Sequence, residues 1–269
     1  MNTRLKEGSP VVWPGFSFSA YVCGVHQPIF DQMSSLHLDM CNAATVDELL
    51  RVMHSDFPVA VVQLPAVFAL IAPSTPAGVA ALNKAKNRLS GKHYGSAIGD
   101  LSAFAAMSQQ ENLPDDFREN MHGMQVLEGA FIRLRVADSR AETVAVSMGT
   151  HQGLLLPEGM ERTLFRAIEQ AFVADGPNEV YAGARYYAPL CTSANLSGDP
   201  FGSIVDLERA HAFVNERNIP LFISNKSAHS EETGSYPIFS FEKNTVTIMR
   251  SGPNQERILR ALPSSITVC

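Results

Sequence analysis

The stretch Thr192-Ser-Ala-Asn195-Leu-Ser-Gly198 ends an apolar segment that begins at Ala188 and is typical of a β-strand. It combines hydroxyl groups with one side-chain amide and a glycine, the residue types from which tight turns are built. At the carboxyl end of a parallel strand in an α/β sheet, the same groups can donate hydrogen bonds to a phosphate or a ribose. The stretch therefore predicts a strand end with two open roles, a turn that binds nothing or one wall of a nucleotide site.

Strands and helices alternate along the chain on both sides of this stretch. The β-branched run from Val59 to Leu64 is typical of a strand buried on both faces. Further strands are expected at 130–136, 143–148, 188–193, 219–224, 236–241 and 245–250. Helices are expected at 45–54, 75–88, 101–109, from 114 onward, and at 160–174, 206–217 and 253–262. Because these elements interleave without a strict βαβ rhythm, the sequence predicts an α/β fold with one mixed, twisted sheet flanked by helices.

Several of the predicted helices carry start signals. Thr45 and Glu48 have the spacing of a capping box, in which two side chains bond backbone N–H groups reciprocally. Single N-caps are predicted at Ser74 or Thr75, at Asp100 and at Asp206.

The length and composition indicate one large domain. A hydrophobic share of 45% among 269 residues, with 18% charged, is enough to form a sizeable core. Single α/β domains often reach about 250 residues. We therefore expect one domain over residues 45–269. Residues 1–44, interrupted by Pro10, Pro14 and Gly15, are expected to form an N-terminal extension packed on the main body.

Charge and motif content exclude several functions. A formal net charge of -6 argues against a protein that mainly coats nucleic-acid backbone, because that task needs a basic face. The four cysteines have no paired spacing, and there is no signal-peptide core and no run of roughly 18 apolar residues, so a cytoplasmic protein with free thiols is expected. Motifs for a P-loop, a dinucleotide fold or a serine hydrolase are absent, and the histidines lack metal-ligand spacing. His93 and His151 are interpreted as ordinary polar residues and Cys191 as a buried small side chain.

A second polar constellation consists of cations. Lys86, Arg88 and Lys92 come at the end of a predicted helix, where positive charge complements the helix dipole. Closely spaced cations can equally converge on a polyphosphate, with Arg making bidentate contacts and Lys supplying a mobile charge. Arg250 lies at the end of a predicted strand, before Ser251 and Gly252. We interpret it as a site residue only in combination with the polar stretch 192–198 and the cations at 86–92.

In order and approximate spacing, these segments resemble the threonylcarbamoyl-AMP synthase family. The resemblance rests on Lys86-Asn-Arg88 with Lys92, on Thr192 to Pro200, on Ser235, and on Arg250-Ser-Gly252, and it covers about residues 45–252. It implies the YrdC-like fold, in which a mixed, twisted sheet and its helices surround a large, positively lined cavity.

The resemblance also implies a reaction. The family joins L-threonine, bicarbonate and ATP into threonylcarbamoyl-AMP with release of pyrophosphate, the first step toward N6-threonylcarbamoyladenosine in tRNA. By position, Lys86 and Arg88 would be catalytic, and Lys92 would help to hold the phosphates. The nucleotide would also be bound by Thr192, Ser193, Asn195, Ser235 and Arg250. Mg²⁺ is expected with the ATP, held mainly by phosphates and water rather than by a protein site. Expected partners are a small amino acid or amine, and tRNA-modification proteins or RNA, with no membrane.

The amino-acid side of the family pattern has changed in this chain. Where family members carry Pro-Thr-Glu-Thr-Val-Tyr-Gly-Leu, this sequence has Gln63-Leu-Pro-Ala-Val-Phe-Ala-Leu70. The family Arg-x-Pro is matched by Ser147-Met-Gly149. A site that loses its polar partners loses most of its discrimination. We therefore expect either an enzyme with a different amino substrate or a catalytically silent YrdC-like module that binds nucleotide or structured RNA.

Overall fold

The structure is a computed structural model that describes residues 35–89, 91–136, 140–226 and 232–269. One compact unit takes in all of these residues. Most of the predicted N-terminal extension, residues 1–34, lies outside them, so its packing stays a prediction. Residues 36–39 of that extension form a strand of the sheet. Within the described residues, no helix is long and apolar enough to cross a membrane.

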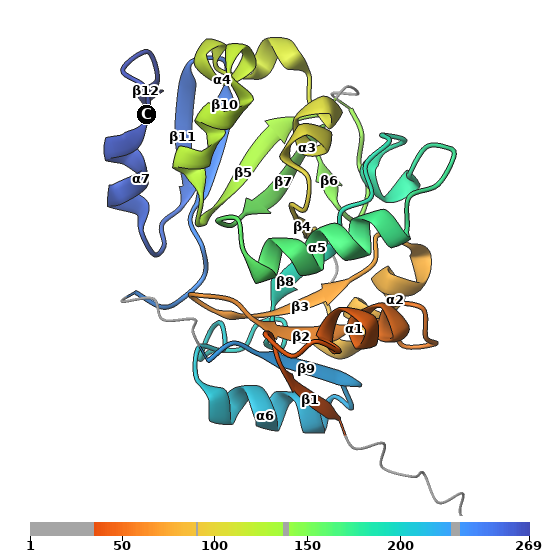
Figure 1. Cartoon of the computed structure of the whole chain (residues 1–269). Helices are drawn as coiled ribbons and strands as arrows, with labels where there is room; N and C mark the ends of the chain where they lie inside the picture. Colours follow the sequence, from red (N-terminus) through yellow and green to blue (C-terminus); the bar gives the residue numbers. More distant parts are fainter. Residues whose placement is uncertain (1–34, 90, 137–139, 227–231) are drawn as a thin grey trace, which may run out of the picture. The chain divides into compact units, whose positions relative to one another are not determined.

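The described strands form one mixed sheet (Figure 1). They are β1 (Leu36–Asp39), β2 (Ala60–Gln63), β3 (Phe68–Ala72), β4 (Gly95–Ala97), β5 (Ala130–Arg135), β6 (Val146–Ser147), β7 (Thr150–Leu155), β8 (Leu190–Ser193), β9 (Leu221–Ser224), β10 (Ile238–Glu242), β11 (Thr245–Arg250) and β12 (Thr267–Val268). Their order is β1-β9-β2-β3-β8-β4-β7-β5-β10-β11-β12, and β6 pairs with β7. The sheet contains parallel pairs such as β2 with β9 and antiparallel pairs such as β5 with β7, which confirms that it is mixed.

Helices cover the sheet between these strands. They are α1 (Thr45–Met53), α2 (Pro76–Lys86), α3 (Leu101–Met107), α4 (Asp115–Glu119), α5 (Met160–Ala171), α6 (Leu207–Glu216) and α7 (Gln255–Ala261), with short 3₁₀ turns at Gln110–Asn112, Met121–Leu127 and Glu179–Tyr181. Thr75, Asp100 and Asp206 cap helices through their side chains, as predicted. The capping box is wrong, because Ala44 is the N-cap and the Thr45 hydroxyl donates instead to the carbonyl of Asp39, at 2.8 Å.

Several strand predictions differ from the structure. The predicted strand at 143–148 is reduced to β6, and the sequence patterns do not predict the longer β7 that follows it. They also do not predict β1, β3, β4 or β12, and residues 68–70 of β3 are matched only as part of a family motif. Strand β8, expected to be parallel, is antiparallel to both of its neighbours, β3 and β4. Strand direction depends on which strands become neighbours, which a local pattern does not encode.

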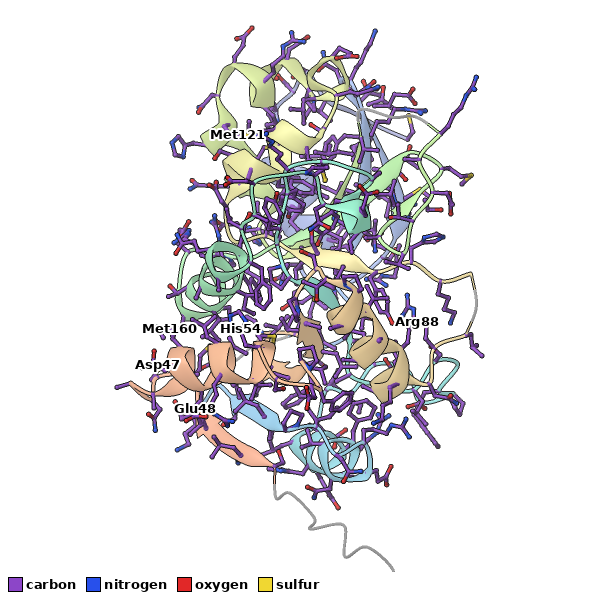
Figure 2. The ribbon with its side chains drawn as sticks, turned by 90° about the vertical axis from the view of Figure 1, so that its right-hand side faces the viewer. Asp47, Glu48, His54, Arg88, Met121 and Met160 are labelled. Carbon is purple, nitrogen blue, oxygen red and sulfur yellow. The ribbon has the colours of Figure 1, made fainter. Side chains whose placement is uncertain are left out.

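The central strands are buried on both faces. Along β2 and β3, Val61 and Leu70 belong to one hydrophobic cluster, while Val62 and Ala69 belong to the other. Helices α1 and α5 contribute Leu49 and other apolar residues to the second cluster, and α2 and α6 contribute theirs to the first. Figure 2 shows α1 and α5 on one side of the strands and α2 and α6 on the other. The continuous apolar run of β2 follows from this two-sided burial.

A buried histidine is held in its neutral form within this core. His151, on β7, is about 1% exposed. Its Nδ1–H donates to the carbonyl of Ala145 at 2.6 Å, so its Nε2 accepts from the hydroxyl of Ser96 at 2.9 Å. The Ser96 oxygen lies 3.0 Å from the Tyr186 hydroxyl, which completes the chain of bonds. Burial lowers the pKa of His151 to about 4.

This pKa predicts an acid-sensitive fold. Between the folded value of about 4 and the ordinary value near 6.5, the unfolded chain binds more protons than the folded one. The contribution is therefore fully present above pH 6.5 and is lost as the pH falls toward 4, at about 3 kcal/mol. Urea unfolding at pH 7 and pH 4.5 should show a smaller pH effect in His151→Gln than in the wild type.

The exposed His122 offers the matched control. His122→Gln should keep the wild-type pH dependence. An equal pH dependence in the wild type and in His151→Gln would show that His151 is not the source of the loss of stability at low pH.

Candidate functional site

One cavity brings together every side chain predicted for the site. It has a volume of about 350 Å³ and is lined by Lys86, Arg88, Lys92, Thr192, Ser193, Asn195, Ser235 and Arg250, together with residues of β3, β4, β5 and β7. Tyr236, Phe131 and Gln152 also line it, and the sequence reading did not select them. The alternating sequence pattern of β5 is enough to place Phe131 on one face of the sheet. The neighbouring residues do not indicate which face borders a cavity.

Helix α2 ends so that its last basic residues reach this cavity. Asn87 takes a left-handed conformation with φ 46°, which asparagine tolerates better than most residues. The helix therefore stops after Lys86, and the Arg88 N–H bonds back to the Asn83 carbonyl at 3.1 Å. Figure 2 shows Arg88 just beyond the end of α2.

Lys86 joins the end of α2 to the loop that follows β8. Its side chain is buried, and its Nζ lies 2.7 Å from the Ser193 carbonyl, 2.8 Å from the Asn195 carbonyl and 2.9 Å from Asn195 Oδ1. Its own carbonyl accepts from the Ser197 N–H at 3.0 Å. Lys86 therefore fixes this loop from both its side chain and its backbone.

The loop itself is a tight, internally bonded turn. The Ser193 hydroxyl donates to Asn195 Oδ1 at 2.6 Å, and the Ala194 N–H donates to the Phe68 carbonyl of β3 at 2.8 Å. This turn lines the cavity, and a nucleotide-binding role for it stays a prediction.

Arg88 is oriented by the segment that follows it. Its guanidinium lies 3.9 Å from the centre of the Tyr94 ring, and Nη2 donates to the His93 carbonyl at 2.5 Å. Its Nε lies 3.3 Å from the Lys92 carbonyl. These contacts hold the charge in place without neutralising it, because carbonyls and a ring carry no net charge. The Lys92 side chain is exposed at the rim.

Arg250 and Ser235 form another part of the cavity wall. Both Nε and Nη2 of Arg250 donate to the Tyr236 carbonyl, at 3.0 and 2.6 Å. Ser235 Oγ bonds the Ser203 hydroxyl at 2.6 Å. Gly252 allows these two segments to touch, because a Cβ built there would lie 2.3 Å from the Ser235 carbonyl oxygen. The Arg-Ser-Gly ending thus matters for close packing as well as for charge.

The cavity carries uncompensated positive charge. Lys86, Arg88, Lys92 and Arg250 line it, while no Asp or Glu of the described residues does, and none of the four cations forms an ion pair there. Burial, reinforced by Arg88 and Lys92, lowers the pKa of Lys86 to about 7. Burial also lowers the pKa of Arg88 and Arg250. In a chain of net charge -6, such a site is suited to an anion.

The part of the cavity wall that departs from the family pattern is apolar. Leu64, Val67 and Ala69 line it, whereas Phe68 points into the core. The segment matched to the family Arg-x-Pro is a hairpin turn between β6 and β7, with φ 47° at Met148 and 66° at Gly149, rather than part of a strand. The sequence pattern does not indicate this turn, because it predicts no strand at the position of β7.

The remaining candidates are placed as follows. His93 lines the cavity, but its Nδ1–H donates to the Thr143 carbonyl at 2.8 Å. Cys191 is buried, as predicted, and burial raises the pKa of its thiol to about 12, so it is not an activated nucleophile. The described residues contain no cluster of three or more acidic, His or Cys side chains that could hold a metal.

Solved structures of Sua5, YciO and HypF have a similar fold. Sua5 from P. abyssi, complexed with L-threonine, gives a TM-score of 0.60 at 13% identity, covering 87% of this chain and 63% of that chain. YciO from E. coli gives 0.56 at 13% identity, covering 81% and 94%. HypF in its phosphate- and nucleotide-bound form gives 0.54 at 16% identity, covering 77% and 28%.

These similarities establish the fold. The YrdC-like α/β fold expected from the motifs is confirmed. The chain spans 63 to 65% of the length of the two Sua5 structures. No protein-family model and no curated protein matches the sequence.

The contacts of Lys86 predict that it stabilises the loop. Lys86→Met should remove three hydrogen bonds to the loop, including the one to the Asn195 carbonyl, and should lower the free energy of unfolding by about 1–3 kcal/mol. Lys84→Met, on an exposed side chain of the same helix, should change it little. Urea unfolding measures both variants. Equal stability of the two variants would contradict this role of Lys86.

Proposed function

We propose that this chain, whose fold is that of Sua5 and YciO, binds ATP in the cation-lined cavity and forms a carbamoyl-adenylate from bicarbonate and a small amino acid or amine, with release of pyrophosphate. The observation that carries the proposal is the convergence of Lys86, Arg88, Lys92 and Arg250 on one cavity that no described carboxylate lines. The family role, a first step in making threonylcarbamoyladenosine in tRNA, belongs to the same proposal, as do a cytoplasmic location and contacts with tRNA-modification proteins.

The reaction suits these residues because it brings two anions, a carbamate and ATP, into contact. The amine nitrogen attacks the carbon of bicarbonate, a C–O bond breaks, and water leaves, which gives a carbamate. A carbamate oxygen then attacks the α-phosphorus of ATP, the bond from this phosphorus to the bridging oxygen of the β-phosphate breaks, and pyrophosphate leaves with the electron pair. Fixed cations reduce the repulsion between the reactants and stabilise the extra charge of the transition state. Arg88 and Arg250, held rigidly by carbonyls and aromatic rings, need no reorganisation to do this. No protein nucleophile is required.

Ser193, Asn195 and Ser235 would position the nucleotide. The Ser193 hydroxyl and the Asn195 oxygen are used in the turn, so the turn would present its outer surface and its backbone to the ligand. Mg²⁺ would arrive with the ATP and be held by phosphates and water. HypF, which has a similar fold, was solved with phosphate and nucleotide, which supports a phosphate-binding use of the cavity.

The amino substrate would differ from L-threonine. Leu64, Val67 and Ala69 give the wall an apolar surface that cannot hydrogen-bond a substrate hydroxyl. An apolar wall discriminates only modestly between side chains of similar size. A small, apolar amino acid or an amine is the substrate class that this wall favours.

A silent module that binds nucleotide or structured RNA is the second candidate. It is favoured by one observation, that the Lys86 ammonium is directed at loop oxygens rather than at the cavity. The net charge of -6 weakens the RNA form of this candidate.

Pyrophosphate release separates the two candidates. We expect turnover that requires ATP, bicarbonate and one member of a panel of amino acids and amines. Arg88→Gln and Arg250→Gln should each weaken ATP binding by about tenfold or more, because each removes a charged hydrogen-bonding partner. Arg118→Gln, which removes an exposed, ion-paired Arg outside the cavity, should bind as the wild type. ATP binding without turnover on any substrate would leave the silent module, and unchanged ATP affinity in both cavity variants would place the nucleotide elsewhere.

Lys86 also predicts proton uptake on binding. A bound polyphosphate would raise its pKa above the value of about 7 in the empty cavity. Affinity should therefore be highest below pH 7 and should fall as the pH rises through that value. Calorimetry at pH 8 in two buffers of different ionisation enthalpy should detect uptake of up to about one proton. Lys86→Met should abolish this uptake, and uptake that persisted in it would assign the proton to another group.

A further inference from the structure

An aromatic ring lies directly against the guanidinium of Arg88. The central carbon of this guanidinium is 3.9 Å from the centre of the Tyr94 ring. Arg209 and Arg250 also lie near rings, at 5.8 and 5.9 Å from the ring centres. A ring attracts a cation that lies within about 6 Å of its centre, so the other two arginines are close to that limit. Among these three arginines, Arg88 therefore has the strongest ring contact.

The Tyr94 ring is itself held in place. Tyr94 is 2% exposed, and its hydroxyl donates to Asn83 Oδ1 at 2.7 Å. Burial raises the pKa of Tyr94 to about 12, so this hydroxyl keeps its proton at neutral pH. The carbonyl of the same Asn83, on α2, accepts from the Arg88 N–H at 3.1 Å. One residue thus anchors both partners of the ring contact.

The bonds of Arg88 leave one end of its guanidinium free. A guanidinium carries five N–H groups. Nε donates to the Lys92 carbonyl and Nη2 donates once to the His93 carbonyl. The two N–H groups of Nη1 and the second of Nη2 make no hydrogen bond to any described residue. Such a free pair of nitrogens can bind two oxygens of one phosphate, and Arg88 lines the main cavity.

A fixed guanidinium binds an anion more tightly than a mobile one. An Arg side chain has several rotatable bonds, and ordering such a side chain on binding lowers affinity by about three- to tenfold. A ring removes this cost and adds no negative charge, so the guanidinium stays able to attract an anion. A leucine in the place of Tyr94 could fill much of the same core space, but it could not hold the cation.

We propose that Tyr94, anchored by Asn83, is a positioning residue that holds Arg88 in the orientation in which it binds the phosphates of the substrate. The inference rests on the proposed function in one respect, that the anion in the main cavity is a polyphosphate. Tyr94 does not line that cavity, so it acts through Arg88.

The first test needs no ligand. The NMR signal of the Arg88 Nε–H is assigned from its absence in Arg88→Gln, and its order parameter is measured. We expect a value near the rigid limit of about 0.85 in the wild type and in Tyr94→Phe, and below about 0.6 in Tyr94→Leu. A mobile Arg88 in the wild type, or a rigid one in Tyr94→Leu, would overturn the proposal.

The second test measures anion affinity by calorimetry with ATP and with inorganic tripolyphosphate. Tyr94→Leu should weaken binding of both by about three- to tenfold, whereas Tyr94→Phe, which keeps the ring, should stay within about twofold of the wild type. In Arg88→Gln, the further change Tyr94→Leu should cause no additional loss, because Tyr94 acts only through Arg88. Additive losses, or equal losses in Tyr94→Phe and Tyr94→Leu, would contradict this role.

Two further variants separate positioning from folding. Tyr94 belongs to the hydrophobic core, so the melting temperature of each variant is measured first. Asn83→Ala, at an exposed helix position, removes only the anchor of the ring. It should also make Arg88 more mobile and weaken both anions, and an unchanged Arg88 in Asn83→Ala and Tyr94→Leu would overturn the proposal. Tyr187→Leu, which changes a tyrosine outside both cavities, is the control and should bind ATP as the wild type does.

The outcomes distinguish this inference from the proposed function. A wild type that binds neither ATP nor tripolyphosphate would refute the proposed function and, with it, the phosphate role of Tyr94. A wild type that binds both, with the same affinities in Tyr94→Leu, would refute only the role of Tyr94.

Discussion

The buried ammonium of Lys86 is the contact on which the candidate site depends. It ties the end of α2 to the loop after β8 through three bonds shorter than 3 Å, and the Lys86 carbonyl holds the same loop one turn further on. Arg88 follows two residues later and lines the same cavity as the loop. One side chain thus sets the relative position of the two most polar segments of the chain.

The cavity is built to keep positive charge without neutralising it. Arg88 and Arg250 are held by carbonyl oxygens and lie over the rings of Tyr94 and Phe131. Such partners hold a guanidinium in one position and leave its positive charge able to attract an anion in the cavity. A carboxylate partner would neutralise this charge. Burying a cation beside like charges costs stability, and the pKa of Lys86 is lowered first by burial and then by Arg88 and Lys92. Proteins commonly accept this cost where a ligand supplies the missing charge.

The walls of the site differ in polarity. The cationic and hydroxyl-bearing segments carry the side chains that resemble the family pattern, while the wall formed by Leu64, Val67 and Ala69 is apolar. Phe131, Gln152 and Tyr236 also line the cavity, and the sequence motifs did not implicate them.

The sequence by itself determined the α/β class and the N-caps at Thr75, Asp100 and Asp206, and it singled out eight residues that line one cavity, because periodicity, capping and motifs are local properties. It also indicated the fold through the order of its motifs. Only the tertiary structure decided that β8 is antiparallel to its neighbours and that Ser193 and Asn195 bond Lys86. Each of these depends on contacts between segments far apart in the sequence, and such contacts follow from the packing of the whole sheet.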